Sequence, residues 1–138
     1  MIRIQTQPIE PDELCRNVAS ENAGAVILFI GTTRRMTAGR ETVRLEYDCY
    51  ESMALSELNK LRDETLERWP LTGCAVVHRI GVVEIGEASV AVAISSPHRA
   101  SAYEASQWLM DTLKKKVPIW KKEQWTDGET DWIHPESN

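Results

Sequence analysis

Leu113-Lys114-Lys115-Lys116-Val117-Pro118-Ile119-Trp120-Lys121-Lys122-Glu123 is the stretch from which the fold of this chain can be worked out. Val117 precedes a proline, which disfavours the helical conformation, so the helical pattern before it is expected to end there. The residues that follow are expected to be extended. Lys114 then lies on the last turn of a helix and Lys121 on a strand or loop, and such a break can aim two ammonium groups at one point.

The lysines of this stretch have an alternative interpretation. Cations at a helix end complement the helix dipole, each contributing roughly 0.3–1 kcal/mol, and the later lysines could simply be solvated. Two features favour a functional site instead. Trp120 lies between the basic groups, and the rest of the chain contains only one lysine, Lys60, although the formal net charge is -5.

The composition fits a single globular domain spanning residues 1–138. Hydrophobic residues make up 42% of the chain, and no long polar run marks a tail or linker. No apolar run reaches the length of a signal region or a membrane span, so we expect a cytoplasmic protein that does not enter a membrane. Cys15, Cys49 and Cys74 are odd in number and far apart, which argues against a disulfide framework or a structural zinc site.

Apolar patterns predict strands and helices along the first half of the chain. A short strand is expected at residues 2–4, and a helix begins at Pro11. The continuous apolar run 25–30 is typical of a strand buried on both faces, and we expect it at the centre of the sheet. Residues 42–50 alternate strictly and predict a half-buried strand, whereas residues 51–69 carry apolar side chains at helical spacing.

Two further strands are predicted at residues 74–80 and 88–94. The segment 81–86 joins them and is bounded by glycines, which permit tight turning, so a hairpin-like pair is expected. His78 lies inside the first of these strands. We interpret it as a structural or partly exposed strand residue rather than a ligand.

The last part of the chain predicts a long helix and a hairpin. Ser96 is expected to be the N-cap and Pro97 the first helical residue of a helix that runs to about residue 116. Asp127-Gly128 is a hairpin turn signal between residues 121–125 and 132–133. The lysine stretch therefore connects the helix to the hairpin.

The segment 31–40, Gly-Thr-Thr-Arg-Arg-Met-Thr-Ala-Gly-Arg, is predicted to be a functional loop. It is bracketed by glycines, carries three arginines and shows no apolar periodicity. Such a loop is often only a solvated connection. Its position directly after the predicted central strand favours a function.

His98 and Arg99 are predicted in the first turn of the long helix. Unpaired backbone N–H groups and the helix dipole favour an anion there, such as a phosphate or a carboxylate. The alternative is that both residues are merely exposed. Because the dipole disfavours cations at this end, their presence favours a functional interpretation.

Five basic residues together predict a site for an anionic small molecule: Arg34, His98, Arg99, Lys114 and Lys121. No acidic pair or Ser-His-Asp set suggests hydrolysis, and no metal-ligand spacing or glycine-rich nucleotide loop is present, so neither a metal nor a cofactor is expected. A lysine in a partly dry pocket can act as a general acid or base, because burial and neighbouring cations lower its pKa.

Two other classes of function are open at this point. Lysines interleaved with Trp120 and Trp125 could bind nucleic acid by gripping phosphates and stacking on bases, although the overall acidity of the chain argues against this. The chain could also be a catalytically silent scaffold for a partner protein. Lys114 and Lys121 argue against that reading.

The sequence resembles the large catalytic subunit of molybdopterin synthase across nearly its whole length. The resemblance is carried by motifs distributed along the chain: Gly24-Ala25-Val26, Phe29-Ile30-Gly31-Thr32-Thr33-Arg34, Leu45-Glu46-Tyr47 with Tyr50 and Met53-Ala54, His78-Arg79-Ile80-Gly81, Ser96-Pro97-His98-Arg99 with Ala102 and Glu104-Ala105, and Leu113-Lys114 with Pro118 and Trp120-Lys121-Lys122-Glu123. The last of these is the most specific.

The resemblance implies a sulfurtransferase of molybdenum cofactor biosynthesis with an α+β fold, an α/β hammerhead with an additional small β subdomain. Its substrate would be cyclic pyranopterin monophosphate, which receives two dithiolene sulfurs and becomes molybdopterin. The sulfur would arrive on a small ubiquitin-like subunit whose C-terminal Gly-Gly thiocarboxylate enters the large subunit. A homodimer of large subunits within a heterotetramer is implied, and no nucleic-acid or membrane partner.

The resemblance also implies roles for particular residues. Lys114 and Lys121 match the essential lysines of the family, and three residues match substrate-binding positions: Arg34, His98 and Arg99. Further substrate contacts are expected from flanking residues: Thr32, Thr33, Lys122 and Glu123. The chain departs from the family at residues 35–38, and the resemblance assigns no role to residues 133–136.

Helix geometry predicts how these residues are shared between chains. Arg99 and Lys114 are fifteen residues apart on one predicted helix, which corresponds to about 22 Å at 1.5 Å per residue. One small pterin cannot contact both. If both serve one substrate, they come from different protomers and the site lies at a two-fold interface.

Overall fold

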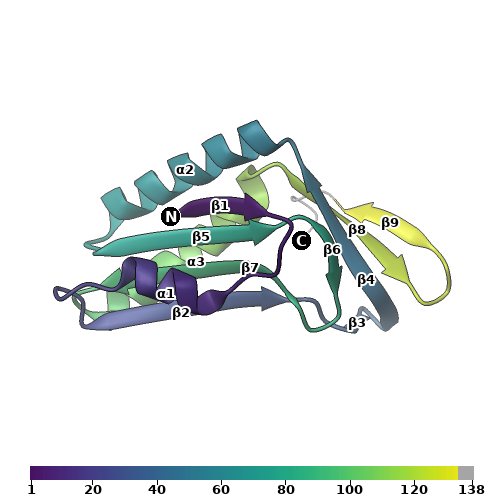
Figure 1. Ribbon diagram of the computed structural model, residues 1–138, viewed down its shortest axis with the longest axis horizontal. Coiled ribbons are helices and arrows are strands. Elements are labelled where there is room, and N and C mark those ends of the chain that lie inside the picture. Colours follow the sequence, from purple (N-terminus) through teal and green to yellow (C-terminus); the bar gives the residue numbers. More distant parts are fainter. Residues whose placement is uncertain (134–138) are drawn as a thin grey trace.

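The computed structural model describes residues 1–133, which form two β-sheets and three α-helices (Figure 1). The predicted α+β class is confirmed, and the hammerhead designation stays a prediction. Residues 134–136 lie outside the described part of the chain. The elements in chain order are β1 (Ile2–Gln5), α1 (Pro11–Val18), β2 (Ala25–Thr32), β3 (Met36–Thr37), β4 (Arg40–Cys49), α2 (Glu51–Arg68), β5 (Gly73–Arg79), β6 (Gly81–Glu84), β7 (Ala88–Ser96), α3 (Arg99–Lys116), β8 (Ile119–Trp125) and β9 (Thr130–Ile133).

The first sheet has the strand order β1-β5-β7-β2 and is covered by helices on both faces. Alternate residues of β5 point to opposite faces, as the two-residue period of a strand requires. Val76 packs in the cluster formed with α2 and α3, whereas Val77 packs against Leu14 and Val18 of α1. Figure 1 shows α1 in front of this sheet and α3 behind it.

The second sheet has the order β3-β4-β8-β9, and β6 pairs with β4. β6 follows β5 after one residue, Ile80, so the chain passes directly from the first sheet into the second. Gly81 has a φ of 85°, a left-handed conformation that favours glycine, and it makes this passage possible. The predicted joining segment 81–86 therefore contains a strand that the sequence pattern did not reveal.

The prediction that residues 25–30 form the central strand is wrong. β2 is an edge strand, hydrogen-bonded to β7 only, and β7 with β5 occupies the centre. Val26 is 45% exposed and Phe29 39% exposed. A continuous apolar run indicates that a strand avoids water, but it does not specify how many neighbouring strands pair with it.

Two other local predictions need correction. The segment 31–40 is not an irregular loop throughout, because Met36 and Thr37 pair with Glu41 and Arg40 as a short hairpin. Helix α3 begins at Arg99 rather than Pro97. Ser96 is the last residue of β7 and is buried, and His98 is the N-cap.

The elements around the lysine stretch are where the sequence predicted them. α3 ends at Lys116, and Val117 has an extended conformation, with φ -84° and ψ 126°. β8 and β9 pair antiparallel around Gly128, which has a φ of 89°. Within residues 1–133, none of the helices is sufficiently long and apolar to cross a membrane.

Candidate active site

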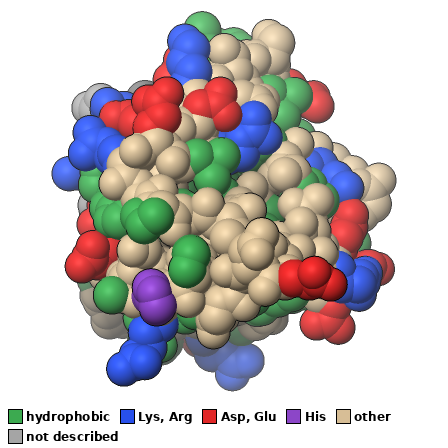
Figure 2. Space-filling model, turned by 90° about the vertical axis from the view of Figure 1, so that its left-hand side faces the viewer, with side chains coloured by type: hydrophobic (Ala, Val, Ile, Leu, Met, Phe, Trp, Pro, Cys, Tyr) green, Lys and Arg blue, Asp and Glu red, His purple; other side chains and the backbone are tan. Residues whose placement is uncertain are grey.

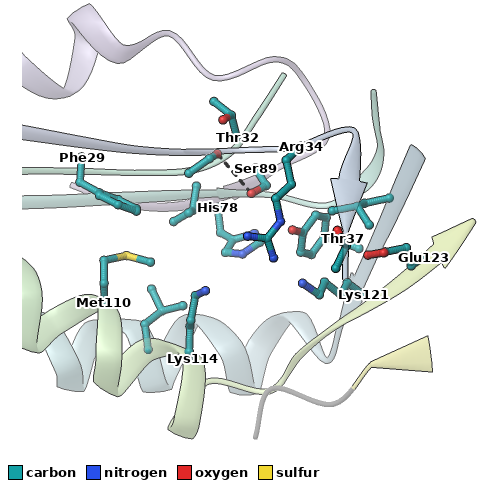
Figure 3. Close-up of a pocket in the computed structure, with 15 residues that line it drawn as sticks. Phe29, Thr32, Arg34, Thr37, His78, Ser89, Met110, Lys114, Lys121 and Glu123 are labelled. Atoms are coloured by element: carbon teal, nitrogen blue, oxygen red, sulfur yellow. Dashed lines mark hydrogen bonds between the residues drawn. The ribbon is translucent and has the colours of Figure 1, made fainter. Parts of the chain in front are cut away.

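A cavity of about 220 Å³ lies where the two sheets meet the carboxyl end of α3 (Figure 3). Its wall combines residues from both sheets, from the hairpin after β2 and from α3. The lining residues are Phe29, Gly31, Thr32, Arg34, Thr37, Leu45, Tyr47, His78, Ser89, Val90, Met110, Leu113, Lys114, Lys121 and Glu123.

Lys114 and Lys121 enter this cavity from two different elements. Lys114 is on the last turn of α3, and Lys121 is on β8, opposite Tyr47 of β4. The helix stops at Val117 because of the following proline, and the chain reverses into β8. Figure 3 shows both amines directed into the cavity. The structure therefore brings together the two lysines that the sequence singled out.

The environment of Lys121 alters its acidity. Burial lowers the pKa of its ammonium group below the ordinary value. The carboxylate of Glu123 opposes this effect, and the positive charges of Lys114 and Arg34 add to it. Lys121 therefore gives up a proton more readily than an exposed lysine does.

The end of β2 and the connection that follows it contribute two of the three contacts predicted there. Thr32 and Arg34 line the cavity, and Arg34 extends toward the space between the lysines in Figure 3. Thr33 does not line it. Thr33 is buried, its amide donates to the carbonyl of Glu87, and its carbonyl accepts from Gly86. Thr33 thus fixes the hairpin to the turn before β7.

The strand alternation of β8 separates Glu123 from Lys122. Glu123 faces the cavity side, is only 2% exposed, and accepts a hydrogen bond of 3.3 Å from Thr42 Oγ1. A bulge between Thr42 and Arg44 turns Thr42 inward and interrupts the strict alternation predicted for residues 42–50. Lys122 lies on the opposite face, with Nζ 5.7 Å from the centroid of the Trp132 ring, and does not line the cavity.

His98 and Arg99 lie at the other end of α3 and do not line the cavity. Both are exposed. Figure 2 shows the end of the molecule at which α3 begins, and there acidic, basic and hydrophobic side chains are mixed. Within one chain, these two residues are not brought to Lys114 and Lys121.

The sequence missed His78 and Tyr47 as cavity residues. Their rings pack edge to face at a centroid distance of 5.1 Å, and both line the cavity. Burial lowers the pKa of His78 to about 4, and it raises the pKa of Tyr47. A polar residue inside an apolar strand was the available signal, but the sequence could not show that this strand faces a cavity.

The aromatic residues proposed for base stacking have other contacts. Trp125 is buried, and the guanidinium of Arg40 lies 4.1 Å from the centroid of its ring. Arg40 also pairs with Asp127 and Glu129 at 2.9 and 3.0 Å, so it anchors the β8–β9 hairpin. Trp120 packs edge to face against Tyr50. These contacts give the tryptophans a structural role.

The cavity suits an anionic small molecule. Arg34, Lys114 and Lys121 supply positive charge, and a lysine with a lowered pKa can also transfer protons. Among residues 1–133, no three His, Cys, Asp or Glu side chains are grouped as a metal site would need.

The chain is similar to known proteins along nearly its whole length. A family model described as MoaE protein matches residues 4–116. The molybdopterin synthase catalytic subunit of Bacillus subtilis is 48% identical over 130 residues, which cover 94% of this chain and 82% of the relative.

Solved structures have the same fold. The crystal structure of molybdopterin synthase from Staphylococcus aureus matches with a TM-score of 0.89 at 40% identity and covers 94% of each chain. A chain from the protein–protein complex of subunits 1 and 2 of molybdopterin-converting factor from Helicobacter pylori matches with a TM-score of 0.76 at 21% identity, over 96% of this chain and 88% of that chain.

Proposed function

The chain belongs to the MoaE protein family, and we propose that it is the catalytic subunit of a molybdopterin synthase. In the proposed reaction, cyclic pyranopterin monophosphate receives two dithiolene sulfurs from the C-terminal thiocarboxylate of a small ubiquitin-like subunit. One observation carries this proposal. Arg34 from the connection between β2 and β3, Lys114 from α3 and Lys121 from β8 line a single cavity.

Each cation of the cavity has a distinct proposed role. Arg34 binds the phosphate of the substrate, since a guanidinium offers paired donors that fit phosphate oxygens. Lys121 moves protons as the carbon–sulfur bonds form, because its lowered pKa brings the neutral amine within reach. Lys114 balances the negative charge of the incoming thiocarboxylate. Thr32 and Glu123 complete the contacts proposed within this chain.

The remaining proposed contacts require a second copy of the chain. His98 and Arg99 are at the far end of α3, about 22 Å from Lys114 at the rise of an α-helix. We assign them to the substrate bound by the other protomer of a homodimer. Lys122 lies on the outer face of β8, so the proposal does not include it among the residues that contact the substrate in this cavity.

The proposed assembly is a heterotetramer of two such chains and two small subunits. The fold shared with the Helicobacter pylori protein, which was solved in a complex of two subunits, supports a protein partner. β6 follows directly on β5 of the first sheet and pairs with β4 of the second, and this continuity supports the proposal of a single domain for residues 1–138.

The proposal is tested by reconstitution. The purified chain is incubated with cyclic pyranopterin monophosphate and a thiocarboxylated small subunit, and the dithiolene product is detected. The expected result is product formation that depends on both proteins. The matched control is the same small subunit with an ordinary C-terminal carboxylate, which supplies no sulfur. Absence of product with the thiocarboxylated subunit, in a complex shown to form, would exclude this function.

A further inference from the structure

His78 is a polar side chain buried within the first sheet. It lies on β5 between Ile4 of β1 and Val90 of β7, and only 5% of its surface is exposed. Burying an imidazole without hydrogen bonds is unfavourable. The partners of its two ring nitrogens therefore indicate what the residue does.

The contacts of the ring determine its tautomer. Nδ1 lies 2.8 Å from the carbonyl oxygen of Arg79. Because a carbonyl only accepts hydrogen bonds, Nδ1 carries the hydrogen, and Nε2 of the neutral ring is an acceptor. Among residues 1–133, the hydrogen bond to Arg79 is the one that the ring makes, and Nε2 is not among the fully buried atoms without a partner, so it can be reached from the cavity. The ring lines the cavity, as Figure 3 shows.

The surroundings keep the imidazole neutral. Burial lowers its pKa to about 4, although the hydrogen bond to the backbone opposes the shift. Three of the four charged side chains that line the cavity are positive. They are Arg34, Lys114 and Lys121, and the fourth is Glu123. Tyr47, which packs against the ring, is also neutral because burial raises its pKa.

Two of the other polar groups that line the cavity have partners within the chain. The hydroxyl of Ser89 donates to the carbonyl of Gly31 at 3.3 Å. Glu123 accepts from Thr42, and its charge acts on Lys121. Nε2 of His78 is thus a neutral acceptor without a partner, in a cavity where Arg34 and the ammonium forms of the lysines only donate. A ligand that satisfies the whole cavity is anionic at one part and offers an N–H or O–H at another.

We propose that His78 determines the specificity of the cavity by accepting, at Nε2, a hydrogen bond from an N–H or O–H on the neutral part of the ligand. The inference deepens the proposed function and rests on it, since a reduced pterin phosphate carries both an anionic group and ring N–H groups. An anion without an N–H or O–H group, such as sulfate, binds to the positive side chains only.

Two substitutions separate the acceptor from the packing role of the ring. In His78→Asn the amide can still donate to the Arg79 carbonyl, but no acceptor remains at the position of Nε2. In His78→Gln the longer side chain can place an amide oxygen near that position. KM and kcat are measured for heterotetramers that contain each variant and for the wild-type heterotetramer. Sulfate binding by each free large-subunit chain is measured by calorimetry.

The expected result is a KM for the pterin substrate about tenfold higher in His78→Asn, the effect of losing one hydrogen bond. Its kcat changes less, its affinity for sulfate is unchanged, and His78→Gln recovers part of the loss. A wild-type KM in His78→Asn overturns the inference, while product formation by the wild-type enzyme leaves the proposed function standing. Equal losses for sulfate and substrate also overturn it, because they indicate a structural role.

A measurement on the unaltered protein covers the case in which the variants do not fold. Nitrogen NMR of labelled histidine reports which ring nitrogen is protonated, and the His78 signals are those absent from spectra of His78→Asn or His78→Gln. Where neither folds, they are the signals that remain when His98 and His134, the other two histidines of the chain, are substituted. We expect a protonated Nδ1 and a free Nε2 at neutral pH, and a shift of the Nε2 signal when substrate is added. A protonated Nε2, or no shift at saturating substrate, overturns the inference.

Discussion

The two ends of helix α3 carry similar charges in different surroundings. At the carboxyl end, Lys114 shares a cavity with Arg34 and Lys121, and the neighbouring charges act on one another. At the amino end, His98 and Arg99 are exposed and line no part of that cavity. The difference teaches that the fold of one chain brings together the basic residues of the cavity end only. In the proposed homodimer, the other end of α3 would serve the cavity of the partner chain.

The largest expected effect comes from removing the lysines of the cavity end. Lys114→Ala and Lys121→Ala should each lower product formation by at least about 10²-fold, the usual scale for losing an acid–base group or a group that stabilises negative charge. The melting temperature should stay within about 2 °C, because neither ammonium group has a partner in a salt bridge among residues 1–133. Turnover and thermal unfolding are measured on the same preparations.

Lys115→Ala is the matched control for this experiment. Lys115 is adjacent to Lys114 and is exposed, but it does not line the cavity. Its activity should stay close to that of the wild type. Near-normal turnover in both cavity variants would show that the lysines are not catalytic.

The second prediction tests whether the two ends of α3 work across a dimer. Arg99→Ala and Lys114→Ala homodimers should both be inactive or nearly so. A mixed dimer of one chain of each kind contains one site with both residues intact, and it should recover about half of the wild-type activity. Differently tagged chains allow the mixed dimer to be purified and assayed.

A mixed dimer with no recovered activity would mean that His98 and Arg99 do not serve the cavity of a partner. The control is a dimer of two Lys114→Ala chains that carry the two different tags and are purified in the same way. It should show no recovery.

The third prediction concerns the division of labour within the cavity end. Arg34→Ala should raise the KM for the pterin substrate roughly 10- to 100-fold, the range for hydrogen bonds to a charged group, with a smaller change in kcat. Arg34→Lys keeps the charge but loses the paired donors, so its KM should lie between those of the wild type and Arg34→Ala. An unchanged KM would contradict phosphate binding by Arg34.

Arg34→Ala should also alter the pH dependence. The charge of Arg34 lowers the pKa of Lys121, so its removal raises that pKa. The ionisation of Lys121 in the pH profile of kcat should therefore move to higher pH.

The smallest effect is expected on the outer face of β8. Lys122→Ala should change kcat and KM by less than about twofold, because Lys122 points away from the cavity toward Trp132. Lys121 and Lys122 are adjacent in sequence but lie on opposite faces of β8. Comparing the Lys121→Ala and Lys122→Ala variants therefore tests the two faces of one strand separately. A loss of activity in Lys122→Ala comparable to that in Lys121→Ala would place both lysines in the reaction.

Much of the local structure could be predicted from sequence. Val117-Pro118 ended α3, and Asp127-Gly128 formed the turn between β8 and β9. The start of α3 was misplaced by two residues. A serine before a proline is a good cap signal, but here Ser96 is needed in β7, where its neighbours are buried in the first sheet.

The candidate site was predicted only in part, because the sequence shows which residues are charged but not which face of a strand they occupy. Lys114, Lys121 and Arg34 were identified because charged residues at the ends of apolar elements are visible in a sequence. His78 was not identified as a cavity residue, because a polar residue inside a predicted strand was interpreted as structural or partly exposed, and the sequence could not show that this strand faces a cavity. Lys122 was included only because it is adjacent to Lys121, and the pleat of β8 sends it to the other face.

The sequence by itself determined features that depend on neighbours along the chain. Backbone preferences and side-chain periodicity act over a few residues, and they set the carboxyl end of α3, the β8–β9 turn and the positions of the lysines. Only the tertiary structure decided the order of the strands, the edge position of β2 and the presence of His78 in the same cavity as Lys114 and Lys121. These depend on pairing and packing between residues distant in sequence, and no local pattern specifies which distant segment becomes the neighbour.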